Sequence, residues 1–286
     1  MARLQVASRV DTASDLMTEW VVAITPSDSL LKARDLMTRK GVSQLVVVDP
    51  RQRPVGILSK RDIACFLLED PTTRPLEEML VSEASSQSYR TLRSNLPVFN
   101  AARVFDIENL AYAVVSNDQP LAGIMTETDL CYYFSRKFSE KFEVRDFMIR
   151  DFIFAMSTYP VIHVAYGIVF RQPGIPVIDE ELVGILTLSD LLSIRERTLG
   201  TVGARLSSKS EVENDMALIT TNDLMTRNPI ITHERTDLAQ AAQVMIGKGI
   251  SSLPVLDDKL KVVGLLTKHD IVRALGRVGR SIILEP

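Results

Sequence analysis

Cysteine is scarce in this chain, since only Cys65 and Cys131 occur among its 286 residues. Two cysteines on their own form neither a disulfide framework nor a zinc site. Both fall within segments that are predicted to be helical, and we expect both to be buried thiols.

The residue patterns of common catalytic sites are also missing. The chain contains no glycine-rich P-loop, no Ser-His-Asp order and no His-Glu-x-x-His sequence. His163 lies in an apolar segment that predicts a helix, where a histidine is usually part of the core. His233 lies in a predicted turn with no cysteine or aspartate arrangement around it. We therefore expect a protein that is not an enzyme and that has no metal site and no cofactor.

An excess of positive charge is absent too. The net charge is −3, which lacks the basic footprint of a nucleic-acid-binding protein. The apolar content of 46% and the charged content of 24% are typical of a soluble globular chain of one to three domains.

Long hydrophobic runs are limited to residues 152–170, which contain no charged side chain. This stretch includes Ser157, Pro160 and His163 and only just reaches the length needed to cross a bilayer. We interpret it as a buried strand followed by a buried helix, with no membrane insertion. The first six residues lack the pattern of a signal peptide, so we expect a cytoplasmic protein.

One short sequence pattern occurs four times in the chain. It consists of a glycine, two apolar residues, a hydroxyl residue, two variable residues and an aspartate. We call it the Gly-to-Asp motif, and its copies are 56–62, 123–129, 184–190 and 264–270. Self-similarity at a nearly constant interval is typical of a repeat protein, and four repeats are predicted.

Each repeat is predicted to have the order strand, helix, strand, strand, helix. In the first repeat, residues 21–24 are apolar, Leu30, Ala33 and Met37 form a helical stripe, Gly41 ends the helix, and residues 45–48 and 55–58 form a hairpin. The fourth repeat follows the same plan, with residues 229–231 as its first strand, Leu238, Ala241 and Met245 as the stripe and Gly249 as the end. The second repeat (Leu96, Ala101, Phe105, with Asn109 in place of glycine) and the third (Ala165, Val169) are more divergent.

The connections between repeats predict two modules. The first, 1–139, contains repeats at about 12–70 and 75–138, and the second, 140–286, contains repeats at about 143–198 and 216–278. Residues 195–215 form the longest connection, which predicts a surface loop.

This repeat, with its leading Leu-Met-Thr and its closing Gly-to-Asp motif, resembles the cystathionine-β-synthase (CBS) domain family over residues 12–278. Four repeats in tandem are similar to the arrangement in the γ subunit of AMP-activated protein kinase and its archaeal stand-alone relatives. The resemblance implies an α+β fold in which β-α-β-β-α repeats pair about pseudo-two-fold axes and two pairs form a disc. It also implies that clefts between the repeats bind AMP, ADP, ATP or S-adenosylmethionine.

The resemblance further implies a role for particular residues. The ribose hydroxyls would bind the motif aspartates Asp62, Asp129, Asp190 and Asp270. The phosphates would face the motif hydroxyls and their neighbours Ser59, Lys60, Arg61, Thr126, Thr187, Ser189, Thr267, Lys268 and His269. The base would lie against Val22, Val46, Pro176, Ile230 and Pro254. A carboxylate bonds a vicinal diol strongly, and a helix N-terminus stabilises a phosphate.

A second interpretation of the motif is purely structural. A hydroxyl residue followed three positions later by an acid is nearly a capping box, which closes the N-terminus of a helix. Capping boxes prefer Glu or Gln, whereas all four copies carry Asp, and the motif glycine predicts a close backbone approach. Both features favour ligand binding over capping alone.

The variable residues of the motif distinguish the four copies. Lys60 and Arg61 in the first and Lys268 and His269 in the fourth predict the sites for a polyanion. The third copy has a second hydroxyl at Ser189, which would suit AMP. Glu127 in the second predicts an empty site or an uncharged adenosyl group.

The sequence therefore predicts a regulatory, energy-sensing protein that binds an adenine nucleotide, or alternatively S-adenosylmethionine, and signals to a partner protein such as a kinase, a transporter or an enzyme. A homodimer is compatible with this prediction. The alternative is a structural interaction module built from CBS repeats that binds no ligand.

Overall fold

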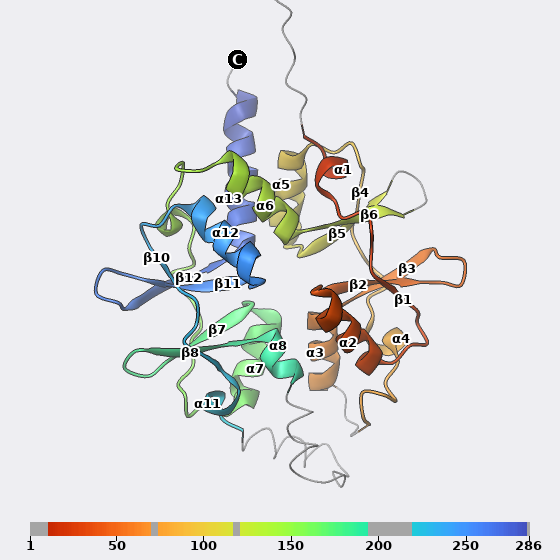
Figure 1. Ribbon diagram of the computed structural model, residues 1–286, viewed down its shortest axis with the longest axis horizontal. Helices are drawn as coiled ribbons and strands as arrows, with labels where there is room; N and C mark the ends of the chain where they lie inside the picture. The colour runs from red at the N-terminus through yellow and green to blue at the C-terminus, as the bar shows by residue number, and fades with distance from the viewer. Residues whose placement is uncertain (1–10, 70–73, 117–120, 194–218, 285–286) are drawn as a thin grey trace, which may run out of the picture.

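The computed structural model describes residues 11–69, 74–116, 121–193 and 219–284 of the chain. Figure 1 shows four small α/β units around a common centre, in a disc viewed down its shortest axis. The predicted surface loop at 195–215 lies outside the described residues.

The first repeat has the predicted order of elements. It consists of β1 (Ala23–Ile24), α2 (Leu30–Lys40), β2 (Gln44–Val48), β3 (Pro54–Ser59) and α3 (Lys60–Glu69). Strand β2 pairs in parallel with β1 and antiparallel with β3, and the ladder changes register between Val47 and Val48. The predicted stripe of Leu30, Ala33 and Met37 is fully buried. Gly41 ends α2 at φ 64°, a left-handed conformation that glycine adopts without strain.

The second and fourth repeats have the same topology. Their elements are β4 (Thr91–Leu92), α5 (Val98–Glu108), β5 (Tyr112–Ser116), β6 (Leu121–Thr126) and α6 (Glu127–Lys137), and β10 (Thr232–His233), α12 (Leu238–Lys248), β11 (Ser252–Leu256), β12 (Val262–Thr267) and α13 (Lys268–Leu284). Asn109 adopts φ 51° where the other two repeats have glycine. Leu96 precedes α5, because Pro97 is the N-cap of that helix.

The first strands differ most from the prediction. Strand β1 covers only half of 21–24, and β10 follows the predicted 229–231, so that His233 lies in a strand and not in a turn. The third repeat consists of α7 (Val161–Phe170), β7 (Gly174–Ile178), β8 (Leu182–Thr187) and α8 (Leu188–Leu192), and its predicted first strand is reduced to one bridge between Ala155 and Val177. His163 on α7 is exposed, so its predicted place in the core was wrong.

The segment that precedes each repeat packs on a different repeat. These leading segments contain α1 (Ala13–Leu16), α4 (Val81–Ala84), the 3₁₀ helix η1 (Val144–Asp146), and α11 (Thr221–Leu224) with β9 (Thr226–Arg227). The bridges Thr18–Ile124 and Ile57–Ser86 join the first two repeats, and the bridge Ile149–Leu265 and the β8–β9 ladder join the last two. The exchange is reciprocal, and it pairs repeat 1 with repeat 2 and repeat 3 with repeat 4.

The cores connect the repeats across these pairs. One cluster combines the helices of repeats 1 and 3, including Met37, Ile63 and Ile168, and another combines those of repeats 2 and 4, including Phe105 and Leu275. A third cluster, Val46, Val48, Ile57, Val114 and Ile124, lies between the sheets of repeats 1 and 2. Each repeat therefore contacts its sequence neighbour through its sheet and leading segment, and a more distant repeat through its helices (Figure 1).

Within the described residues, no helix is both long and apolar enough to cross a membrane.

Candidate functional site

All four motif aspartates help to cap the N-terminus of the helix in which they lie. Oδ2 of each aspartate accepts one hydrogen bond from the backbone N–H and one from the hydroxyl of the residue three positions earlier. For Asp62 the two distances from Ser59 are 2.7 and 2.6 Å, and for Asp270 those from Thr267 are 2.8 and 2.7 Å. Asp129 and Asp190 have the same geometry. The capping interpretation is therefore realised in every copy.

The same arrangement occurs outside the motif. Asp15, Asp28 and Asp223 each accept from the backbone N–H and hydroxyl of a threonine three residues earlier. Aspartate is thus this chain's general capping acid. Its presence in all four motifs does not by itself indicate a ligand.

The motif glycines also have a structural explanation. A Cβ atom at Gly56 would lie 2.8 Å from the carbonyl oxygen of Ser86, and one at Gly123 would lie 2.7 Å from that of Thr18. At Gly264 the nearest atom would be Sδ of Met148, at 2.7 Å, and Gly184 is in contact with Met225. The close backbone approach is confirmed, but the group that approaches is the leading segment of the paired repeat.

The second carboxylate oxygen distinguishes the four aspartates. Within the described residues, no side chain bonds Oδ1 of Asp62 or Asp129, and both residues are half-buried. Oδ1 of Asp190 has a long contact of 3.4 Å with the hydroxyl of Thr226. Oδ1 of Asp270 accepts a 2.7 Å bond from Arg273. Burial raises the pKa of both Asp129 and Asp270.

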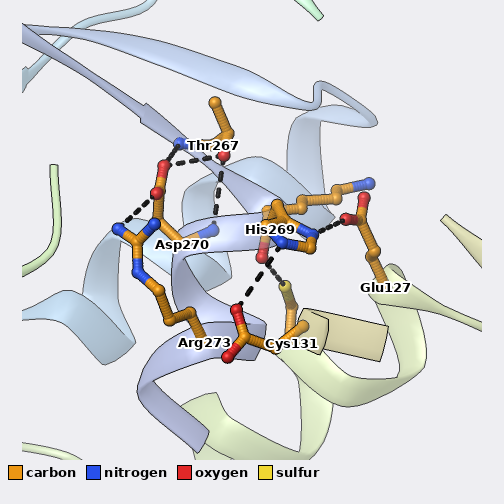
Figure 2. A network of polar contacts seen from close by, with 8 residues as sticks. Glu127, Cys131, Thr267, His269, Asp270 and Arg273 are labelled. Carbon is orange, nitrogen blue, oxygen red and sulfur yellow. Dashed lines mark hydrogen bonds and ion pairs between the residues drawn. The ribbon is translucent and has the colours of Figure 1, made fainter. Parts of the chain in front are cut away.

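The variable residues of the motifs meet across the disc, repeat 1 with repeat 3 and repeat 2 with repeat 4. The Lys60 ammonium donates to the Ser189 hydroxyl at 3.4 Å, and that of Lys268 donates to Thr128 at 2.9 Å. Figure 2 shows the second junction, where Nδ1 of His269 lies 3.0 Å from the Glu127 carboxylate.

The electrostatics of the two junctions differ. The hydrogen bond to Glu127 raises the pKa of His269, and Asp106 on α5 and Asp270 on the same helix act in the same direction. Burial lowers the pKa of Lys60, and no carboxylate in the described part of the chain forms an ion pair with it. The cations of repeat 4 therefore already have partners in repeat 2, whereas the Lys60 ammonium contacts only a neutral hydroxyl.

The residues predicted for the base do not gather in one place. Val46 is buried between the first two sheets, and Val22 packs against the core of repeats 1 and 3. Pro176 and Pro254 are buried in β7 and β11, and Ile230 is 39% exposed. Their role in binding a base stays a prediction, as do the ribose and phosphate roles. Among the described residues, no cluster of histidine, cysteine and acidic side chains suits a metal ion.

A cavity of about 550 Å³ lies beside Asp129, between α1, α6 and the end of α12. Apart from Asp129, none of its lining residues was a candidate site residue from the sequence. They are Asp11, Asp15, Leu16, Thr128, Tyr132, Tyr133, Arg136, Lys137 and Ile246. The face of α6 that turns toward the cavity was visible as a helical stripe. The position of α1 against it was not, because α1 precedes repeat 1 in sequence.

Internal contacts balance the polar groups of the cavity wall. The Tyr133 hydroxyl donates to Asp11 at 3.0 Å, and the Lys137 ammonium lies 3.6 Å from the same carboxylate. The Arg136 guanidinium stacks over the Tyr132 ring, 5.7 Å from its centre. The wall combines flat aromatic faces with both signs of charge.

Comparison with known proteins agrees with the predicted family. The model of the CBS domain family matches residues 13–69, 144–197 and 222–277, which leaves repeat 2 outside the match. The chain is 26% identical over 270 residues to protein MJ1225 of Methanocaldococcus jannaschii, covering 88% of this chain and 94% of that protein. It is 34% identical over 125 residues to the chloroplastic CBS domain-containing protein CBSX1 of Arabidopsis thaliana, covering 39% of this chain and 53% of that protein.

Two solved structures share the whole fold. The crystal structure of MJ1225, described as a candidate archaeal homologue of γ-AMPK, matches 92% of this chain and 99% of its own with a TM-score of 0.79 and 23% identity. A conserved protein of Pyrococcus horikoshii matches 93% of this chain and all of its own with a TM-score of 0.63 and 19% identity. At these identities the likeness shows the fold, and the predicted disc of four CBS repeats is confirmed.

Proposed function

Because the chain belongs to the CBS domain family, we propose that it is a regulatory protein that binds an adenine nucleoside or nucleotide in the clefts between its repeats. The ligand class comprises AMP, ADP and ATP, with S-adenosylmethionine as the alternative. Binding would change the relative position of two repeats and so the affinity for a partner protein. The role is regulatory and not catalytic.

The cavity beside Asp129 is the observation that carries this proposal. Its volume of about 550 Å³ lies within the range of roughly 300–1,000 Å³ that is usual for small-molecule sites. Aromatic rings and the side chains of Leu16 and Ile246 provide surfaces for a flat base. Oδ1 of Asp129, which bonds no side chain of the described residues, would accept from a ribose diol.

Charge distinguishes the ligands of the two junctions. Glu127 and Asp129 begin α6, so a phosphate there would meet two carboxylates, and an uncharged adenosyl group suits repeat 2 better. At repeat 1, the half-buried Lys60 ammonium, Arg61 and the N-terminus of α3 together favour a phosphate. We propose that the phosphorylated nucleotide binds beside Asp62.

The coupling between ligand and partner would follow from the packing. Lys60 and Ser189 belong to different sequence halves but touch at the centre of the disc. A ligand that draws Lys60 toward a phosphate would release Ser189, and it would act on the partner only through its different affinity for the two arrangements. The similarity to MJ1225 supports this proposal, because that protein is described as a candidate homologue of an AMP-activated kinase subunit.

Titration calorimetry of the purified chain with AMP, ADP, ATP, S-adenosylmethionine and adenosine tests the proposal. We expect Asp62→Asn to weaken AMP or ATP at least tenfold and Asp129→Asn to weaken adenosine similarly. Asp28→Asn is the matched control, because it removes the charge from the same type of cap outside the motifs and outside the cavity. Absence of binding for all five compounds at millimolar concentration would overturn the proposal.

A second candidate function is a structural interaction module that binds no ligand. It is favoured by the finding that capping accounts for every motif aspartate and packing for every motif glycine. Under this alternative, Asp62→Asn and Asp28→Asn both lower the melting temperature, and no nucleotide raises it in any variant.

A further inference from the structure

Both oxygens of the Asp270 carboxylate accept hydrogen bonds from groups of the protein itself. The side chain is 1% exposed. Oδ2 accepts from the backbone and the hydroxyl of Thr267, and Oδ1 accepts from the Arg273 guanidinium at 2.7 Å (Figure 2). The bond from Arg273 is charge-assisted and reaches a carboxylate that is almost fully buried, although the arginine side chain itself is 30% exposed. A ribose diol would have to displace this guanidinium before it could reach Asp270.

Arg273 has no counterpart in the other three repeats. The position three residues after the motif aspartate holds Cys65, Tyr132 and Ser193 in repeats 1, 2 and 3. Residues three apart lie on the same face of a helix, so an arginine at this position can bond the aspartate. At this position of the sequence, repeat 4 alone has a cation.

Arg273 is also held from its other side. Its guanidinium donates a second bond of 2.7 Å to the carbonyl oxygen of Phe147, in the leading segment of repeat 3. That segment pairs with repeat 4 through the bridge of Ile149 with Leu265. The guanidinium thus connects the motif to the paired repeat through the carboxylate oxygen that, in Asp62 and Asp129, has no side-chain partner among the described residues.

The remaining polar groups of this motif are engaged as well. Lys268 is 9% exposed and donates to Thr128, and His269 bonds Glu127. Lys268 and His269 were predicted to neutralise the charge of a bound phosphate, but both bond residues of repeat 2. In repeat 1 the corresponding Lys60 donates to the Ser189 hydroxyl at 3.4 Å and has no acidic partner among the residues that the structure describes.

We propose that Arg273 acts as a built-in occupant of the fourth cleft, so that Asp270 takes no ribose and binding of adenine nucleosides and nucleotides is confined to the clefts of Asp62, Asp129 and Asp190. This inference rests on the proposed function and decides which clefts perform it. The fourth motif then serves the contact between repeats 2 and 4, and Arg273 determines the number of ligands that the chain holds.

The test counts binding equivalents of AMP and of adenosine by calorimetry and equilibrium dialysis, in the full chain and its variants. We expect Asp270→Asn to leave the stoichiometry unchanged and the Kd within about twofold. Arg273→Gln should add one equivalent, which the double variant Arg273→Gln with Asp270→Asn should lose. Arg273→Lys tests the geometry, since a lysine keeps the charge without the planar fork, and it should bind as the wild type does or gain the site only weakly.

The outcomes separate the two proposals. If the wild type and every Arg273 variant bind none of the probes, the proposed function fails and the inference with it. If the wild type binds but Asp270→Asn loses one equivalent, or Arg273→Gln weakens binding, the residues belong to a working site and the inference alone is overturned. Should Arg273→Gln not fold, as judged by its melting curve, the effect of Asp270→Asn in the wild type still decides.

Discussion

Replacing Gly56 with alanine should loosen the contact between the first two repeats. The new Cβ would lie 2.8 Å from the carbonyl oxygen of Ser86, a distance that forces the backbone to move. Ser86 and Ile57 exchange two backbone hydrogen bonds, each 2.9 Å long. The leading segment of repeat 2 would therefore separate from β3.

The size of the effect follows from these bonds. Each contributes about 0.5–1.5 kcal/mol net, and the loss of both is partly offset by roughly 0.4–1 kcal/mol from the stiffer unfolded chain. We expect the free energy of unfolding to fall by about 1–2 kcal/mol. For a chain of this size the melting temperature should fall by roughly 2–6 °C.

Native-state hydrogen exchange at the amides of Ile57 and Ser86 is the direct assay. A loss of 1–2 kcal/mol corresponds to roughly 5–30-fold faster exchange there. Gly247→Ala is the matched control, because a Cβ there would meet no other group of the described residues within 4 Å and the residue lies in the last turn of α12. That change should raise stability by up to about 1 kcal/mol. Unchanged exchange at both amides in Gly56→Ala would refute the role assigned to the motif glycine.

Three further predictions concern the rest of the fold. The pKa of His269 is raised above its ordinary 6.5, so its bond to Glu127 stabilises the fold fully below pH 6.5 and is lost as the pH rises through the raised value. As the pH rises through this range, the melting temperature of Glu127→Gln should fall less than that of the wild type. Parallel plots of melting temperature against pH for the two proteins would contradict the assignment. Asn109→Gly should raise stability by a few tenths of a kcal/mol in urea unfolding, because φ is 51° there; a loss of stability would contradict this. Burial raises the pKa of Cys131 well above its usual range, so iodoacetamide should modify it only on unfolding, and rapid labelling in native buffer would disprove its burial.

Local sequence patterns predicted the secondary structure of the repeats well. The helical stripe from Leu30 to Met37, the glycine at its end and the hairpin that follows depend on neighbours a few residues away. The first strands were predicted less well because they are held by one neighbour only. In repeat 3 the first strand is reduced to a single bridge at Ala155. The apolar residues around it gave no sign in the sequence that the strand would be so short.

The candidate site was predicted in part for the same reason. Each hydroxyl and its aspartate lie on one helical turn, so their mutual bond follows from spacing alone. The partners of Lys268 and His269 lie more than a hundred residues away in sequence, and no local pattern identifies them. The cavity beside Asp129 was missed because α1 packs on a repeat other than the one that it precedes.

The sequence by itself determined that the chain has four units, that each ends in a capped helix, and that the family is that of CBS domains. Periodicity and capping depend on residues within one or two turns, which the sequence displays directly. The tertiary structure showed what each aspartate does with its second oxygen. Asp62 and Asp129 keep one without a side-chain partner in the described residues, whereas Asp270 gives its second oxygen to Arg273, which the leading segment of repeat 3 also holds. A carboxylate has two oxygens, and the cap uses only one. In Asp270 the other oxygen meets Arg273 one turn along the same helix, and the contact that also holds Arg273, with the carbonyl of Phe147, exists only after the repeats have packed.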